Sequence, residues 1–223
     1  MHHFLTLWFD WVQQWGYLGV ILLMAMESSI TPVPSEIVIA PAAYMATLPG
    51  SHMTVWGVIL AGTFGSWLGA AITYWVSRWL GRVIVVKFGG YLMISEKKLE
   101  MAEHWVHRYE AGGIFFARLL PMVRHLISIP AGIIRMGFGD FSVMTIAGSA
   151  SWCTVLAIYG QRVLGDYAKV HPDWMQHPAG VVAFMKSQSH WIIGAILVFC
   201  ILYFLVLKLT AKPAKPVPAA ARQ

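Results

Sequence analysis

Three apolar runs that contain no charged residue constrain the fold of this chain more than any other feature. They cover residues 55–76, 141–159 and 191–207. A helix needs about 20 apolar residues to cross the hydrocarbon core of a bilayer, so the first two runs are long enough and the third is slightly short. The chain has 58% hydrophobic and 12% charged residues, whereas soluble domains carry about 25% charged residues. We therefore predict an all-α integral membrane protein with transmembrane helices at 54–80, 141–165 and 190–209.

The basic residues are distributed unevenly along the chain. Residues 1–77 contain no Lys or Arg, whereas the segment 78–108 contains six and the tail beyond Leu207 contains four. Because Lys and Arg are enriched in cytoplasmic loops, we expect both segments, and hence the C-terminus, in the cytoplasm and the polar loop 166–189 in the periplasm. The net charge of +6 does not indicate nucleic-acid binding, because the basic residues do not gather with aromatic residues on a soluble face.

Two apolar regions, 16–48 and 111–138, do not have the pattern of simple transmembrane helices. Each is interrupted by prolines and charges, and each divides into arms of about 11 to 14 residues, which span only half to two-thirds of a bilayer. A proline frees a backbone carbonyl, which survives at membrane depth only where protein or water covers it. We therefore predict two re-entrant hairpins. Their elbows are placed at Pro32 and Pro34 in the first hairpin, and at Pro121 and Pro130 in the second.

An internal repeat links each hairpin to the apolar run that follows it. The set Ala61-Gly62-Thr63, Ser66-Trp67, Tyr74, Arg78 and Leu80-Gly81 recurs as Ala147-Gly148-Ser149, Ser151-Trp152, Tyr159, Arg162 and Leu164-Gly165. A hairpin returns to the side that it left and a span crosses once, so the second copy must enter from the opposite face. This predicts an inverted repeat of hairpin plus span, an architecture that many secondary transporters share, with the third transmembrane helix added at the C-terminal end.

The remaining segments of the single membrane domain, 1–209, are expected to be accessory. Residues 1–15 are rich in Trp and suit a short interfacial helix. Residues 95–110 carry a helical stripe of apolar side chains among charged ones, which predicts an amphipathic helix on the cytoplasmic face of the membrane. The tail 210–223 is rich in Pro, Ala and Lys and is predicted to be disordered.

Two carboxylates, Glu27 and Glu36, lie nine residues apart on either side of the first elbow. An isolated charge at membrane depth costs about 2.5 to 3.5 kcal/mol on insertion scales, so each needs a partner, water or a proton. A carboxyl group in such surroundings takes up a proton more readily than it does in water. We therefore predict that Glu27 and Glu36 couple the protein to protons.

Cationic residues occupy the second hairpin, where Arg118, Arg124 and His125 lie near the elbow. The guanidinium group stays charged, and its planar fork matches a phosphate group bidentately. We predict that these three residues bind an anionic head group, with His125 acting either as a neutral polar contact or as a proton relay. In the alternative reading, the acids and arginines serve only to lock the two hairpins together.

The order and spacing of these residues resemble the DedA family, also described as SNARE-associated or VTT-domain proteins. The resemblance covers about residues 16–165 and rests on Glu27-x4-Pro32-x-Pro34-Ser35-Glu36, Phe116-x-Arg118-x-x-Pro121-x-x-Arg124 and Pro130-Ala131-Gly132. The runs 26–29, 34–36 and 41–44 are similar to the branch that returns undecaprenyl phosphate across the bacterial inner membrane. Some relatives have Asp and Gly at the positions of Glu36 and Ser35, which bears on the subfamily.

The resemblance implies a multi-pass protein of the bacterial inner membrane that depends on the proton gradient, with essential roles for Glu27, Glu36, Arg118 and Arg124. The leading hypothesis is a translocase for undecaprenyl phosphate. The alternatives are a translocase or scramblase for phosphatidylethanolamine or other phospholipids, and a proton-coupled ion antiporter.

An enzyme, such as a membrane phosphatase, is disfavoured because no nucleophile or cluster of metal-binding carboxylates accompanies the arginines. No cofactor and no metal site is predicted, since the histidines lack ligand spacing. The expected partners are a membrane lipid, polyprenyl phosphate or phospholipid, and protons. A homodimer is compatible with the sequence, which does not decide the oligomeric state.

Overall fold

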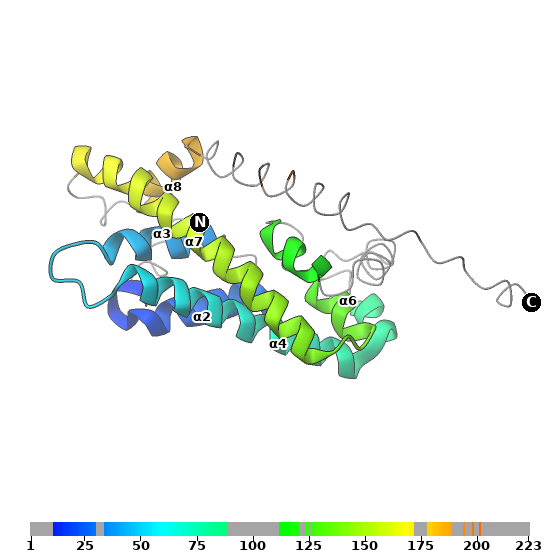
Figure 1. Ribbon diagram of the computed structural model, residues 1–223. Coiled ribbons are helices and arrows are strands. Elements are labelled where there is room, and N and C mark those ends of the chain that lie inside the picture. Colours follow the sequence, from blue (N-terminus) through cyan, green and yellow to red (C-terminus); the bar gives the residue numbers. More distant parts are fainter. Residues whose placement is uncertain are drawn as a thin grey trace, which may run out of the picture.

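The computed structural model of the chain describes residues 11–29, 34–88, 112–120, 124, 126–171 and 178–188, together with positions 194, 198 and 201. Every regular element within these ranges is a helix, which confirms the all-α class (Figure 1). The labelled helices are α2 (Tyr17–Ser29), α3 (Ser35–Met45), α4 (Val55–Phe88), α6 (Ser128–Ile133), α7 (Phe138–Val170) and α8 (Pro178–Ser187). Short helical stretches also lie at 11–15 and 112–119. The predictions for residues 1–10, 95–110, most of 190–209 and the tail 210–223 lie outside the described residues.

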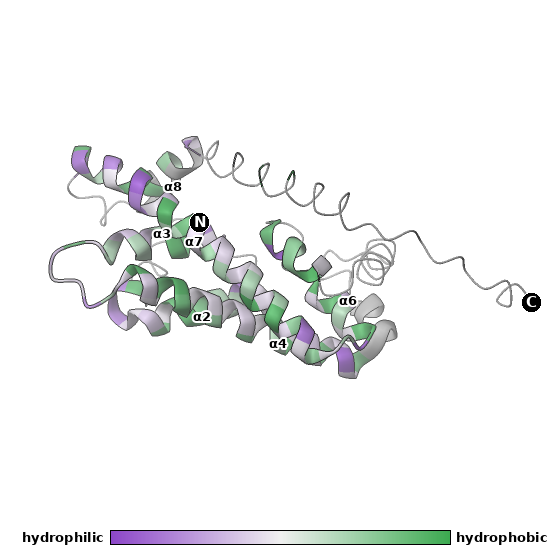
Figure 2. Ribbon diagram, viewed as in Figure 1, coloured by the Kyte–Doolittle hydropathy of each residue, from purple (hydrophilic) through white to green (hydrophobic). Residues whose placement is uncertain are grey.

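Two long helices, α4 and α7, form the centre of the molecule. Val55–Leu80 and Phe138–Val170 are each long and apolar enough to cross a membrane, as predicted for 54–80 and 141–165. Both helices extend beyond the predicted spans, because no proline interrupts them and a glycine such as Gly81 costs a helix only about 1 kcal/mol relative to Ala. Hydrophilic residues gather at the C-terminal end of α7, as Figure 2 shows.

The outer surface of α4 is strongly apolar. Several large hydrophobic side chains are exposed along its length, and 78% of Trp79 is accessible. An apolar surface of this extent is typical of a protein face that lies against lipid rather than water. The exposed members of this face are Trp56, Leu60, Phe64, Ile72, Trp75, Val76, Trp79 and Leu80.

The first proline-broken region consists of two separate helices. α2 and α3 run in opposite directions (Figure 1), and Pro34 is the N-cap residue of α3. α2 lies along α4, and the two helices approach closely at glycine positions. A side chain at Gly65 would meet the backbone oxygen of Ile21, and one at Gly69 would meet that of Ala25.

The second proline-broken region also consists of two short helices. The stretch 112–119 lies against α7 at Gly148, where a Cβ atom would come within 2.9 Å of the carbonyl oxygen of Phe115. α6 packs instead against α4. Here the prediction for Pro130 was wrong, because Pro130 is the third residue of α6 and not part of the elbow. A helix tolerates proline in its first turn, where the backbone N–H has no partner within the helix.

The second arms of the two regions are exchanged between the long helices. α3 packs along α7, where a side chain at Gly160 would meet the backbone of Ala40. In the same way α6 packs along α4, where a side chain at Gly132 would meet the carbonyl oxygen of Tyr74. Each first arm therefore lies on the long helix that follows its own region, and each second arm lies on the other long helix.

The segment after the second long helix differs from the predicted loop. We expected 166–189 to be a polar loop, but α7 continues to Val170 and α8 covers Pro178–Ser187. The aromatic rings of Tyr167 and Phe184 pack together with centroids 4.8 Å apart, which joins α8 to the end of α7. The apolar side chains of Val181 and Phe184 pack against the hydrophobic cluster on α7, which explains why this segment is helical.

Candidate functional site

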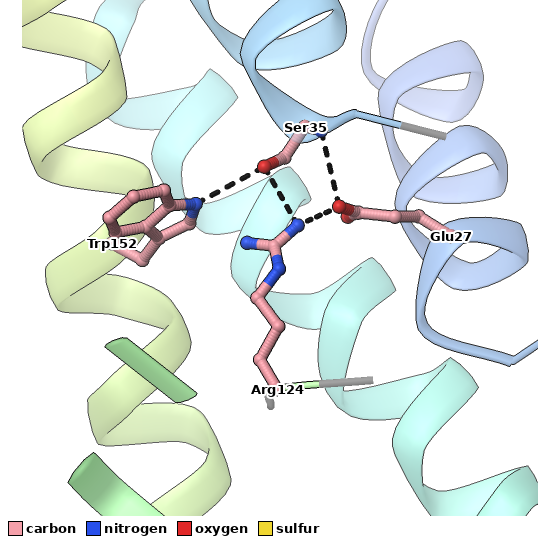
Figure 3. A network of polar contacts seen from close by, with 4 residues as sticks. All are labelled: Glu27, Ser35, Arg124 and Trp152. Carbon is pink, nitrogen blue, oxygen red and sulfur yellow. Dashed lines mark hydrogen bonds and ion pairs between the residues drawn. The ribbon is translucent and has the colours of Figure 1, made fainter. Parts of the chain in front are cut away.

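Arg124 stands at the centre of a buried polar network that joins the two proline-broken regions (Figure 3). Its guanidinium group forms an ion pair with Glu27 and donates a hydrogen bond to Ser35 Oγ at 2.7 Å. The side chains of the ion pair are almost inaccessible, at 8% for Arg124 and 1% for Glu27. Glu27, Arg124 and Ser35 therefore come from three separate segments and meet in the interior.

The local fold explains why Glu27 and Ser35 lie together. Glu27 is in the last turn of α2, and Ser35 is the first residue of α3. Backbone N–H groups in the first turn of a helix have no partner within the helix. The N–H of Ser35 donates to Glu27 Oε1 at 3.1 Å, and a carboxylate is favoured at this end of the helix dipole. The carboxylate of Glu27 thus ties the two arms of the first region together before it meets Arg124.

Trp152 completes the network from α7. Its indole Nε1 donates to Ser35 Oγ at 3.1 Å, and the guanidinium carbon of Arg124 lies 5.7 Å from the ring centroid. Such stacking stabilises a cation through the negative face of the ring. The sequence analysis assigned no site role to either Trp152 or Ser35, so both contributions were missed. The only signal for Trp152 was its position in the internal repeat, opposite Trp67.

Arg118 lies in a different environment from Arg124. It is 3% exposed and donates to Ser128 Oγ at 2.8 Å, while its Nε has no hydrogen-bond partner. In the part of the chain that the structure describes, no carboxylate lies within ion-pair distance of Arg118. The structure therefore brings Arg124, but not Arg118, together with Glu27.

Glu36 is half-buried and belongs to the other side of α3. Among the described residues, no basic group forms an ion pair with it, and its carboxylate interacts electrostatically with Tyr159 on α7. Tyr159 in turn lines a cleft of about 430 Å³ between α7 and α8. The other residues that line this cleft are Val155, Ile158, Arg162, Val163, Asp166, Phe184 and Gln188.

The remaining predicted site residues are only partly described. Pro34 directly precedes α3 as its N-cap residue, and its role as an elbow stays a prediction. Pro32, Pro121 and His125 lie outside the described residues. Cys153 is a free, fully buried thiol that faces Arg124 and Thr63. Within the described ranges, no three His, Cys, Asp or Glu side chains gather as they would around a metal ion.

This arrangement can bind and release an anion. If Glu27 leaves Arg124, the buried guanidinium group keeps a charge that needs a new partner. An anion that offers oxygens to Arg124 can therefore take the place of Glu27. The displaced carboxylate then needs water or a proton. Arg118 already has unused hydrogen-bonding capacity, since its Nε–H faces no acceptor.

Comparisons with known proteins agree on one family. The VTT domain matches residues 33–162. The chain is 36% identical to undecaprenyl phosphate transporter A of Bacillus subtilis, over 90% of this chain and 93% of that protein. It is 26% identical to the protein of the same name from Staphylococcus aureus, over 87% and 93% of the two chains. An alkaline phosphatase-like protein of Lactococcus lactis is 34% identical, over 86% and 88%. No solved structure matches the chain significantly.

Proposed function

The chain belongs to the VTT-domain family, also called the DedA family, and we propose that it is a lipid translocase that returns undecaprenyl phosphate across the bacterial inner membrane with the help of the proton gradient. Two relatives that span nearly the whole chain carry the name undecaprenyl phosphate transporter A. The chain is thus similar to lipid-carrier transporters over its full membrane domain.

The observation that carries this proposal is the buried contact of Arg124 with Glu27 and Ser35. It joins the second proline-broken region to the first through groups that a phosphate can replace. When the phosphate binds Arg124, the carboxylate of Glu27 loses its partner and takes up a proton, and the hairpins lose their main polar connection. Release of the phosphate reverses these steps, so that substrate movement and proton movement are linked at one pair of side chains.

The exchange of the second arms supports an inverted repeat of re-entrant hairpin plus transmembrane helix. If two units of opposite orientation are related by an approximate two-fold axis in the membrane plane, the first arm of each packs on its own span and the second arm on the other span. The contacts of Ala40 with Gly160 and of Gly132 with Tyr74 follow this scheme. Such a scheme lets the units move against each other around a fixed central site.

Glu36 supports a second point of proton exchange. It lies near Tyr159, which lines the cleft between α7 and α8. By the distribution of Lys and Arg, this end of α7 faces the periplasm, whereas the segment 78–108 and the C-terminus face the cytoplasm. Protons can therefore reach Glu36 from outside, and Glu27 stays enclosed until the substrate binds.

Transport in reconstituted vesicles tests the proposal. The purified protein is placed in liposomes with labelled undecaprenyl phosphate and an imposed pH gradient, and the lipid that reaches the opposite leaflet is measured. We expect transport that depends on the gradient and is lost in Arg124→Lys, because an ammonium group keeps the charge but loses the planar fork. Lys169→Ala, at an exposed position of α7, serves as the matched control. The proposal would be contradicted if liposomes without protein, or liposomes with Arg124→Lys, transported the lipid as fast as liposomes with the unmodified protein.

The same vesicles separate the alternatives. Transfer of phosphatidylethanolamine instead of undecaprenyl phosphate would identify a phospholipid scramblase, and proton flux that needs no lipid phosphate would identify an ion antiporter. The relatives named alkaline phosphatase-like make a measurement of released inorganic phosphate worthwhile. We expect undecaprenyl phosphate to be recovered unhydrolysed.

A further inference from the structure

Arg118 lies among other buried donors that have no acceptor. Few buried side-chain atoms lack a hydrogen-bond partner in the described part of the chain, and the nitrogens and hydroxyls among them are Arg118 Nε, Trp67 Nε1, Ser142 Oγ and Thr145 Oγ1. The two nitrogens can only donate. Leaving a buried donor unpaired is costly, so a group of them in one place requires an explanation.

The hydroxyl groups of α7 show that this is not a general property of the helix. Ser151 and Thr154 donate to the backbone carbonyls four residues earlier, at 2.9 and 2.8 Å. Thr145 is fully buried, yet its hydroxyl makes no such bond. Ser142, one turn nearer the start of the helix, is a partly buried residue whose hydroxyl oxygen is also inaccessible and unpaired. The unpaired hydroxyls are thus confined to the N-terminal part of α7.

The contacts between the 112–119 helix and α7 place Arg118 and Thr145 at the same height along α7. Arg118 packs directly on Gly148, where a Cβ atom would lie 2.6 Å from that of Arg118. Thr145 lies one turn from Gly148 on the same buried face of α7. Thr145 and Arg118 therefore belong to one region of the interior.

Trp67 reaches this level from α4. Tyr74 stacks on Phe141 with ring centroids 4.8 Å apart, and Cys153 lies against Gly62. Between these two contacts the antiparallel helices α4 and α7 place Trp67 level with Gly148. Trp67 lies one turn before Ala70 and two turns before Tyr74. It is therefore on the side of α4 that packs with the 112–119 helix.

We propose that Arg118, Thr145 and Trp67 form a second anion site that binds a phosphoryl group. The site has a fixed positive charge, donors without acceptors and, among the described residues, no carboxylate in an ion pair with Arg118. Thr145 precedes Trp152 by seven residues, so the site lies about 10 Å from the Arg124 network along α7. The proposal rests on the function proposed above and divides it between two positions: Arg124 holds the phosphate where it competes with Glu27, and Arg118 holds it nearer the end of α7 that the basic residues assign to the cytoplasm.

Binding titrations of the full-length protein in neutral nanodiscs test this site. The probes are undecaprenyl phosphate, undecaprenol, which lacks the phosphate, and inorganic phosphate. We expect Thr145→Val to weaken binding of undecaprenyl phosphate about tenfold, as the loss of one hydrogen bond to a charged group implies. Thr145→Ser should restore the affinity, and Trp67→Phe should weaken it to a similar extent. Thr154→Val is the matched control, because its hydroxyl is already satisfied by the backbone, and it should bind like the unmodified protein.

Thermal unfolding of the same variants distinguishes a ligand site from a structural role. Thr145→Val removes an unpaired buried hydroxyl, so its unfolding temperature without ligand should be equal to or above that of the unmodified protein. A clear loss of stability with unchanged affinity would assign Thr145 to the packing of α7 and overturn the proposal. The same holds if Thr145→Val and Thr154→Val titrate alike.

The titrations also separate this proposal from the proposed function. If the unmodified protein does not bind undecaprenyl phosphate, both fall. If it binds, and Arg124→Lys weakens binding while Thr145→Val and Trp67→Phe do not, only the second site falls. Binding of inorganic phosphate that depends on Thr145, without binding of the lipid, would overturn the assignment of the site to a lipid head group.

Discussion

Replacing Glu27 by Gln should destabilise the protein far more than the same change at the surface. Glu27→Gln keeps the shape of the side chain but leaves Arg124 buried without a counter-charge. Removing one partner of a buried pair costs about 3 to 5 kcal/mol. Because Arg124 keeps Ser35 Oγ and the ring of Trp152, we expect about 3 kcal/mol. For a chain of this size that corresponds to a fall of roughly 6 to 12 °C in unfolding temperature.

The chain contains its own control for this experiment. Asp166 and Lys169 form an ion pair of the same kind on the surface of α7, with side chains 74% and 77% exposed. An exposed pair contributes about 0 to 1 kcal/mol, so Asp166→Asn should have little effect. Unfolding of the purified variants in detergent is followed by tryptophan fluorescence. The double variant Glu27→Gln with Arg124→Leu should recover much of the lost stability, because both charges are then absent.

Two results would refute the reasoning. If Glu27→Gln and Asp166→Asn shift the unfolding temperature equally, the ion pair in the interior is solvated and not buried. If Arg124→Leu destabilises the Glu27→Gln variant as much as it destabilises the unmodified protein, Arg124 is stabilised by groups other than Glu27.

Three further predictions follow from the packing and the topology. Gly160→Ala should destabilise the protein by about 1 to 3 kcal/mol in a thermal unfolding assay, because its methyl group meets the backbone of α3. Gly165→Ala, whose methyl group would make only an ordinary contact with α3, should be neutral or stabilising in the same assay. Trp152→Phe removes the hydrogen bond to Ser35 and should lower the unfolding free energy by about 1 kcal/mol. Reporter fusions after residues 173 and 222 should give opposite sides of the membrane, and the same side for both would contradict the topology.

Much of the helical framework could be predicted from local sequence. Charge-free runs of sufficient length indicated the helices α4 and α7, and the prolines indicated that residues 16–48 form two helices rather than one. The position of Pro34 at the start of α3 follows from its fixed backbone angle and missing N–H. The two errors have different causes. Pro130 lies in the first turn of α6, where a helix tolerates proline, so a local rule was misapplied. The apolar residues of 178–187 form α8 because they pack on α7, a contact that local sequence does not reveal.

The sequence by itself determined that two acids on one broken region and two arginines on the other lie within apolar segments. Their cost at membrane depth requires partners, whatever the fold. Only the tertiary structure decided that Arg124 pairs with Glu27 while Arg118 does not. Gly148 lets the 112–119 helix pack closely on α7, and there Arg118 reaches Ser128 and not a carboxylate of the described residues. Residue spacing carries no information about such contacts between segments, so Trp152 and Ser35 became visible as site residues only in the folded protein.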